Sequence, residues 1–137
     1  MSIKQCIIIQ CDSALKRCSG FACMDSFYNK EGKFGDYGNN MKYITFSCGG
    51  CCGKAVAGKL EHFLMKMRKK TDLKKEEIVI HLATCMVSEN HHSDRCPYID
   101  YIKDIIAKKG FENIVEGTYI SKTAEKKRET GEYKRYF

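Results

Sequence analysis

A chain of 137 residues with 43% hydrophobic residues is long enough to bury a core, and its size predicts one domain. Its odd number of cysteines, nine, and the short apolar run near Met1 argue against a secreted disulfide framework, and no segment reaches membrane-spanning length. We therefore expect a cytoplasmic protein with reduced thiols. In that compartment, abundant cysteine indicates metal binding or thiol chemistry.

The net charge of +7 raises the question of a nucleic-acid partner. However, the basic residues are spread over polar helix faces and the C-terminal end, without interleaved aromatic residues. The pattern favours a solvated surface over a nucleic-acid site. Residues 122–137 hold six Lys or Arg against three Glu and show no apolar periodicity. We therefore divide the chain into a domain over 1–120 and a basic tail over 121–137.

Apolar periodicity predicts alternating strands and helices along the domain. In chain order they are a strand at 3–10, a helix at 19–30, a strand at 43–47, a helix at 53–70, a strand at 78–82, a helix from Pro97 to a cap at Gly110, and a strand at 113–120. The alternation predicts an α/β fold. We expect a parallel sheet of about four strands with helices on both faces, in a three-layer, Rossmann-like or flavodoxin-like order.

Cysteines follow the first three predicted strands. Cys11, Cys48 and Cys85 each lie just past a strand's carboxyl end, and in a parallel sheet those ends share the edge where ligands bind. The loops that follow bring more of the same side chains to this edge. These are Cys18, Cys23, Cys51, Cys52, His91, His92 and Cys96.

The tetrad Cys48-Gly49-Gly50-Cys51 lies between a strand and a helix, where a helix N-terminus favours thiolate over thiol. Thiolates with imidazole select zinc or iron–sulfur clusters over hard cations. We predict Cys48 and Cys51 as metal ligands, followed by Cys85, Cys11 and Cys96, with Cys18 and His92 behind them. The residues leave open whether the metal is zinc, iron or an iron–sulfur cluster, because no spacing matches a zinc finger or a ferredoxin.

Two other functions compete for the same turn. Cys48 and Cys51 could instead cycle through a disulfide, which would make the protein a thiol/disulfide redox protein. The segment from Gly49 to Lys54 could bind a phosphate, but Ala55 stands where a P-loop needs Ser or Thr. The sequence leaves open whether the chain is an enzyme, and it identifies no protein partner.

Structural roles are expected for several residues of the same types. Cys6 lies within the first strand and is expected to be a small buried hydrophobe. His81 lies inside the third strand and is expected to be a hydrogen-bonded core histidine. Asp12 is expected either to shape a turn or to orient a ligand.

The chain resembles the CGGC-domain family, named for the tetrad that stands here at Cys48 to Cys51. The matching segments are Ile8-Ile9-Gln10-Cys11, the Cys18…Cys23 pair, Thr45 to Lys54, His81 to Cys85, Cys96 to Asp100 and Glu116-Gly117-Thr118. The resemblance implies a metal-binding domain, with zinc expected and no settled reaction. The family often has histidine where this chain has Tyr98 and Tyr119. If those histidines are ligands in the family, His91 or His92 could substitute for them here, or the tyrosines could keep a role in supporting the ligands.

Overall fold

The computed structural model describes residues 3–50, 53–89 and 94–136. Within these residues, four parallel strands form one sheet in the order β2-β1-β3-β4. The strands are β1 (Gln5–Gln10), β2 (Lys42–Ser47), β3 (Ile78–Leu82) and β4 (Asn113–Glu116). This confirms the predicted α/β fold. The strand order is the beginning of the flavodoxin-like order.

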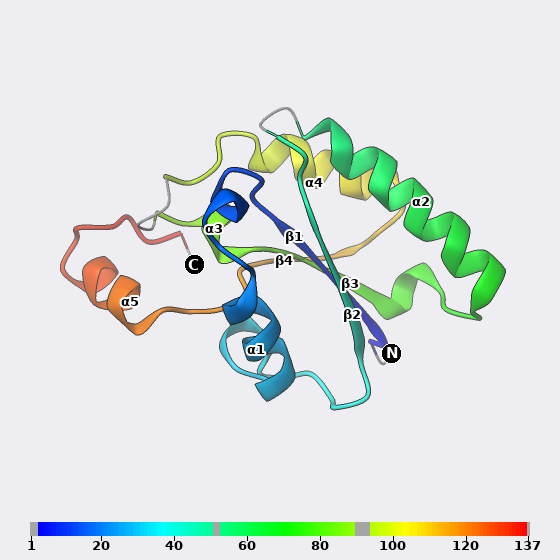
Figure 1. Ribbon diagram of the computed structural model, residues 1–137, viewed down its shortest axis with the longest axis horizontal. Helices are drawn as coiled ribbons and strands as arrows, with labels where there is room; N and C mark the ends of the chain where they lie inside the picture. The colour runs from blue at the N-terminus through cyan, green and yellow to red at the C-terminus, as the bar shows by residue number, and fades with distance from the viewer. Residues whose placement is uncertain (1–2, 51–52, 90–93, 137) are drawn as a thin grey trace.

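Helices cover both faces of the sheet (Figure 1). Helices α2 (Lys54–Lys70) and α4 (Ile99–Lys108) pack against Ile7, Ile9 and their neighbours in the larger apolar core. Helix α1 (Phe21–Asn29) lies on the opposite face, where Phe27 packs with Cys6 and Ile8. Side chains alternate between the faces of a strand, so the buried run Ile7-Ile8-Ile9 supplies both cores.

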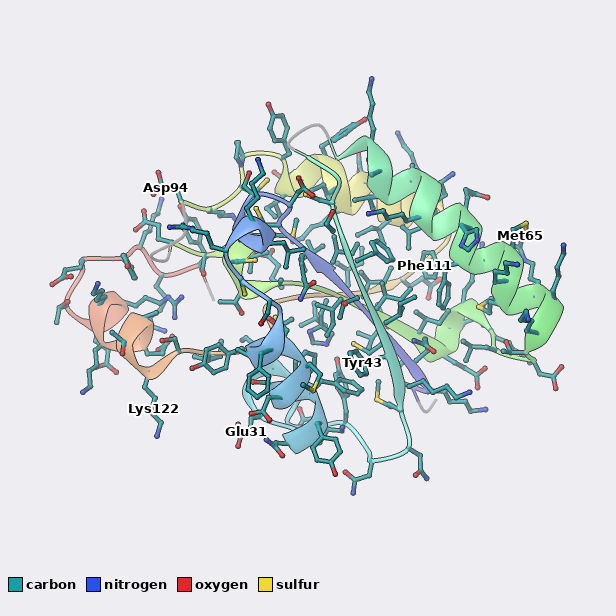
Figure 2. The ribbon with its side chains drawn as sticks, viewed as in Figure 1. Glu31, Tyr43, Met65, Asp94, Phe111 and Lys122 are labelled. Atoms are coloured by element: carbon teal, nitrogen blue, oxygen red, sulfur yellow. The ribbon has the colours of Figure 1, made fainter. Side chains whose placement is uncertain are left out.

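The two central strands are buried, whereas the edge strand β2 is largely exposed. Every residue of β1 and β3 is buried, whereas the first four residues of β2 are exposed. Phe111, which follows α4, completes the larger core and is 2% exposed (Figure 2).

The predicted elements agree with the observed ones except near two ends. Helix α4 begins at Ile99 instead of Pro97, because Tyr98 has non-helical dihedrals and its carbonyl accepts the first helical bond, from Ile102. Strand β4 ends at Glu116 because Gly117, with φ of 109°, turns the chain away.

Among the described residues, two α-helices were not predicted from the periodicity. One is the short α3 (Thr84–Val87), and the other is α5 (Lys122–Glu129) within the basic tail. Ser121 caps α5 by accepting a hydrogen bond from the Ala124 N–H at 3.3 Å. Among the described residues, no helix is long and apolar enough to cross a membrane.

His81 is the buried histidine expected at the centre of β3, and its side chain is fully hydrogen-bonded. Nδ1 lies 2.7 Å from the Gly117 carbonyl, and Nε2 lies 2.7 Å from the Tyr37 hydroxyl. Because a carbonyl only accepts, Nδ1 carries the proton and Nε2 accepts from Tyr37. Burial lowers the pKa of His81 to about 4.

We predict that His81 makes the protein less stable in mild acid. In the unfolded chain His81 binds a proton near pH 6.5, whereas in the folded chain it stays neutral until about pH 4. The stability that the neutral His81 contributes is therefore fully present above pH 6.5 and is lost as the pH falls toward 4. Between pH 7 and pH 5 this linkage removes about 2 kcal/mol. Urea unfolding at both pH values measures the loss, and His81→Gln should be less stable at pH 7 but lack this part of the pH dependence. An equal pH dependence in the variant would contradict the assignment.

Candidate functional site

The site lies at the carboxyl edge of the sheet, where the strand order reverses. β1 pairs with β2 on one side and β3 on the other, so the loops after β1 and β3 diverge and leave a crevice between them. Backbone pairing continues past the strands. The Cys48 N–H donates to the Gln10 carbonyl and the Ala83 N–H to the Ile9 carbonyl, both at 2.9 Å. Cys11, Cys48 and Cys85 are therefore held at the same edge.

Consecutive backbone groups of the loop after β1 contact sulfurs on both sides. The Asp12 N–H donates to Cys48 Sγ at 3.5 Å, and the Cys11 backbone hydrogen-bonds to the Cys85 thiol. Backbone N–H donors of this kind stabilise a thiolate and, in metal sites, tune the ligand. The central strand thus presents donors to the cysteines of both neighbours.

Unlike Cys48, of which 6% is exposed, Cys85 is only partly buried. Burial raises its pKa to about 12, against the opposing effect of the Cys11 backbone hydrogen bond, and negative charge on Cys11, Cys23 or Cys18 would raise it further. At neutral pH Cys85 is therefore protonated. The same interactions show that Cys85 lies near three other thiols. Loading a cation here must release protons.

A cavity of about 200 Å³ opens beside Cys85. Cys18 and Cys23 line it together with Cys85, although the three come from different segments. Cys23 Sγ lies 3.2 Å from the Thr118 hydroxyl. Thr118 and Thr84 also exchange two hydrogen bonds. The Thr118 N–H donates to Thr84 Oγ1 at 2.8 Å, and the Thr84 N–H donates to Thr118 Oγ1 at 3.2 Å. This pair joins the end of β4 to α3 and so fixes the cavity wall.

Two more cysteines accept backbone hydrogen bonds. Cys18 Sγ accepts from the Gly20 N–H and Cys96 Sγ accepts from the Tyr98 N–H, each at 3.4 Å. Cys96 packs against the larger core together with Cys11, whereas Cys23 packs against the smaller one and Cys85 touches both. The cysteines therefore gather around the sheet edge on both of its faces, with Cys85 between them.

The described cysteines do not form a ready-made metal site. Over residues 3–50, 53–89 and 94–136, no three Cys, His, Asp or Glu side chains are arranged to hold a metal ion, and no two cysteines are joined by a disulfide. Of the residues predicted as ligands, Cys11, Cys18, Cys48, Cys85 and Cys96 are described. Cys51 and His92, like Cys52 and His91, lie outside the described residues.

The turn after Cys48 depends on Ser47 and Gly49. The Ser47 hydroxyl donates to the Asp12 carboxylate at 3.0 Å and accepts from the Gly49 N–H at 3.0 Å. Gly49 has φ of 76°, and a Cβ placed on it would lie 2.1 Å from the Ala55 side chain in the first turn of α2. Only glycine permits this approach, which explains the first glycine of the tetrad.

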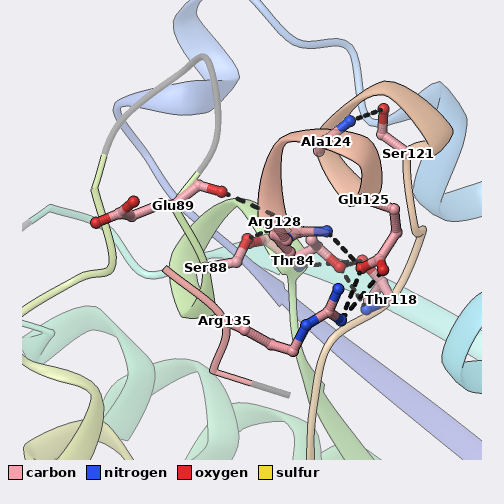
Figure 3. A network of polar contacts seen from close by, with 9 residues as sticks. All are labelled: Thr84, Ser88, Glu89, Thr118, Ser121, Ala124, Glu125, Arg128 and Arg135. Atoms are coloured by element: carbon pink, nitrogen blue, oxygen red, sulfur yellow. Dashed lines mark hydrogen bonds and ion pairs between the residues drawn. The ribbon is translucent and has the colours of Figure 1, made fainter. Parts of the chain in front are cut away.

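Helix α5 supplies a wall of the site that the sequence analysis missed. Ala124 and Arg128 line the cavity, and the Arg128 side chain is only 1% exposed. Figure 3 shows its guanidinium bonded to the Glu125 carboxylate at 2.9 Å and to the Ser88 hydroxyl at 3.2 Å. The signal for this helix in the sequence is the run of good helix formers after Ser121. The run has no apolar stripe, because the side chains that the helix buries are the short Ala124 and the charged Arg128.

Further contacts bind the C-terminal segment to the loop before α4. The Lys134 N–H donates to the Glu89 carboxylate at 2.7 Å, and the Arg95 guanidinium lies over the Tyr136 ring, 4.7 Å from its centroid. Arg95 also pairs with Glu116 of β4 at 2.6 Å. The segment thus lies against the same edge as the cysteines.

The sequence comparison decides the family. The family model for the CGGC domain matches residues 5–119. The chain belongs to the CGGC-domain family. Searches of curated proteins and of solved structures found no significant match. The family match ends at Tyr119, so α5 and the residues after it lie outside the matched CGGC domain.

We predict that Gly49→Ala destabilises the protein by roughly 2–4 kcal/mol, because it adds left-handed strain to a steric clash with Ala55. Chemical denaturation measures this loss. Gly58→Ala is the matched control: it lies inside α2 with nothing within 4 Å of the added methyl, so it should stabilise by about 0.5–1 kcal/mol. Combining Gly49→Ala with Ala55→Gly should recover part of the loss, and a Gly49→Ala variant of unchanged stability would contradict the packing argument.

Proposed function

We propose that this CGGC-domain protein binds a thiophilic metal ion, with zinc expected, through the cysteines at the carboxyl edge of its sheet. The observation that carries the proposal is the pair of backbone donors in the loop after β1. Cys11 hydrogen-bonds to the Cys85 thiol and Asp12 to Cys48 Sγ, so one loop contacts the sulfurs that follow both neighbouring strands. Sulfurs that accept N–H bonds in this way are suited to carry negative charge as ligands.

The proposed ligands are the residues predicted from the sequence. Cys11, Cys48 and Cys85 are the central candidates, and Cys51, Cys96, Cys18 and His92 are the candidates to complete the coordination. Because the described residues alone hold no three-ligand group, binding requires either a ligand from outside them, such as Cys51 or His92, or a movement of the described thiols. A zinc ion bound by four protein ligands would be structural, and one with an open position could act on a substrate.

Proton release gives the proposal a measurable signature. With its pKa near 12, Cys85 loses a proton only when a cation replaces it. Zinc affinity should therefore rise with pH, about tenfold per pH unit for each proton released. The protein contributes the donors and the closed environment, and the metal contributes the charge that holds the thiolates.

The test is metal analysis of anaerobically purified protein, followed by zinc titration against a chromophoric chelator at pH 6.5 and 7.5. We expect near-stoichiometric metal, tighter binding at the higher pH, and loss of affinity of at least about tenfold in Cys48→Ser and Cys85→Ser. Cys6→Ala is the matched control, because Cys6 is a fully buried thiol with a pKa also raised to about 12, yet it packs with Phe27 and Phe34 in the smaller core. Its zinc affinity should match that of the wild type.

The same samples distinguish the redox alternative. A protein that binds no zinc at either pH, and that forms a Cys48–Cys51 disulfide reversed by mild reductant, would overturn the metal proposal. Peptide mapping after controlled oxidation detects that disulfide.

A further inference from the structure

Strand β2 forms one edge of the sheet, and no described strand pairs with its outer side. On its inner side, Lys42 donates its N–H to the carbonyl of Lys4, just before β1, at 3.2 Å, and Cys48 donates its N–H to the Gln10 carbonyl of β1 at 2.9 Å. Backbone groups alternate between the two sides of a strand, so Tyr43 and Thr45 direct their N–H and C=O groups outward.

The edge carries side chains that are unusual for an open surface. Tyr43 and Ile44 are each 41% exposed, and the strand reads Lys-Tyr-Ile-Thr-Phe-Ser, which is rich in β-branched and aromatic residues (Figure 2 labels Tyr43). Proteins usually protect such an edge with a short strand, a bulge, proline or a covering segment. Here the strand is regular over six residues, and Lys59 Nζ donates to the outward Ser47 carbonyl at 2.9 Å at its end.

A groove of about 670 Å³ runs beside this edge, between β2 and α2. Its apolar part includes Ile44, Phe46 and Phe63, and three lysines, Lys59, Lys66 and Lys70, line it from α2. None of the described residues that line the groove is acidic. The groove therefore combines apolar surface with positive charge that no acidic lining residue offsets.

Charge decides which occupant fits. A second copy paired edge to edge would bring the lysines of both grooves together, which opposes association. A nucleic acid would find the positive charge, but it offers no backbone amides for the outward groups of Tyr43 and Thr45. An extended acidic peptide satisfies both features, since its backbone continues the sheet and its carboxylates meet the lysines.

We propose that β2 and the α2 groove bind an extended peptide segment that carries acidic and apolar side chains, added to the sheet as a fifth strand. On the groove side, apolar residues of the peptide pack against Ile44 and Phe46, and carboxylates pair with Lys66 and Lys70. None of the described residues that line the groove is a cysteine, so the proposal does not depend on metal binding.

The probe is a fluorescent synthetic peptide of about eight residues, the length that a strand like β2 can pair with. The positions on one face of this strand are valine, glutamate, valine and glutamate in turn, and the positions between them are serine. A matched control peptide has lysine in place of each glutamate. Fluorescence anisotropy with the full chain should show saturable binding of the acidic peptide that weakens with added salt. The lysine peptide should bind at least about tenfold more weakly.

Two pairs of variants test the surface. Lys66→Glu with Lys70→Glu should weaken binding at least about tenfold, whereas Lys122→Glu with Lys126→Glu, an equal charge change on exposed residues of α5, should leave it within about twofold. Thr45→Pro removes an outward N–H and should abolish binding, while Thr45→Val keeps the N–H and should retain it. Circular dichroism confirms that each variant is folded, and if Thr45→Pro is not, the charge-reversal pair still decides.

Three outcomes would overturn the proposal. One is no binding of the acidic peptide at low salt. Another is tighter binding of a single-stranded RNA oligonucleotide that the Lys66/Lys70 reversal abolishes, which would make the groove a nucleic-acid site. The third is a concentration-dependent dimer, seen by light scattering, that Thr45→Pro dissociates.

Discussion

The pairing of β1 between β2 and β3 is the constraint on which the rest of the structure depends. Its register sets Gln10 opposite Ser47 and Ile9 opposite Leu82, so the residues that follow the three strands emerge at one level. The three buried isoleucines of β1 hold this register, because a slip by one residue would exchange the side chains that face the two cores. Strand pairing therefore places Cys11, Cys48 and Cys85 at the same edge of the sheet, although their side chains do not form a three-ligand group.

The polar interactions around this edge attach the segments between the strands to the sheet. Thr84 and Thr118 join α3 to the end of β4, and His81 joins β3 to Gly117 and Tyr37. Each of these buried groups has its partner, as buried polar groups require. The same strands that position the cysteines thus also restrain the segments that carry Cys23 and Cys85.

The opposite ends of the molecule illustrate two different uses of positive charge. Arg128 of α5 is buried and paired with Glu125, so its charge serves to hold the C-terminal segment against the cavity. Lys66 and Lys70 are exposed on α2 beside an open strand edge, where charge is available to a partner. A net charge of +7 does not distinguish these roles, because each depends on what lies beside the side chain.

The sequence alone determined the fold class, the four strands and the convergence of Cys11, Cys48 and Cys85, because hydrophobic period is local and the carboxyl ends of parallel strands share one edge. It also indicated that Cys6 and His81 are buried. Only the tertiary structure decided that the surroundings of Cys85 raise its pKa, and that α5 packs on the cavity. It also decided that the Cys11 backbone contacts the Cys85 thiol and that the Asp12 N–H contacts Cys48 Sγ. The tertiary structure also decided that β2 is an edge strand, although its residues resemble those of a covered strand. Strand order arises from packing between segments that are distant in the sequence, and hydrophobic periodicity does not record it.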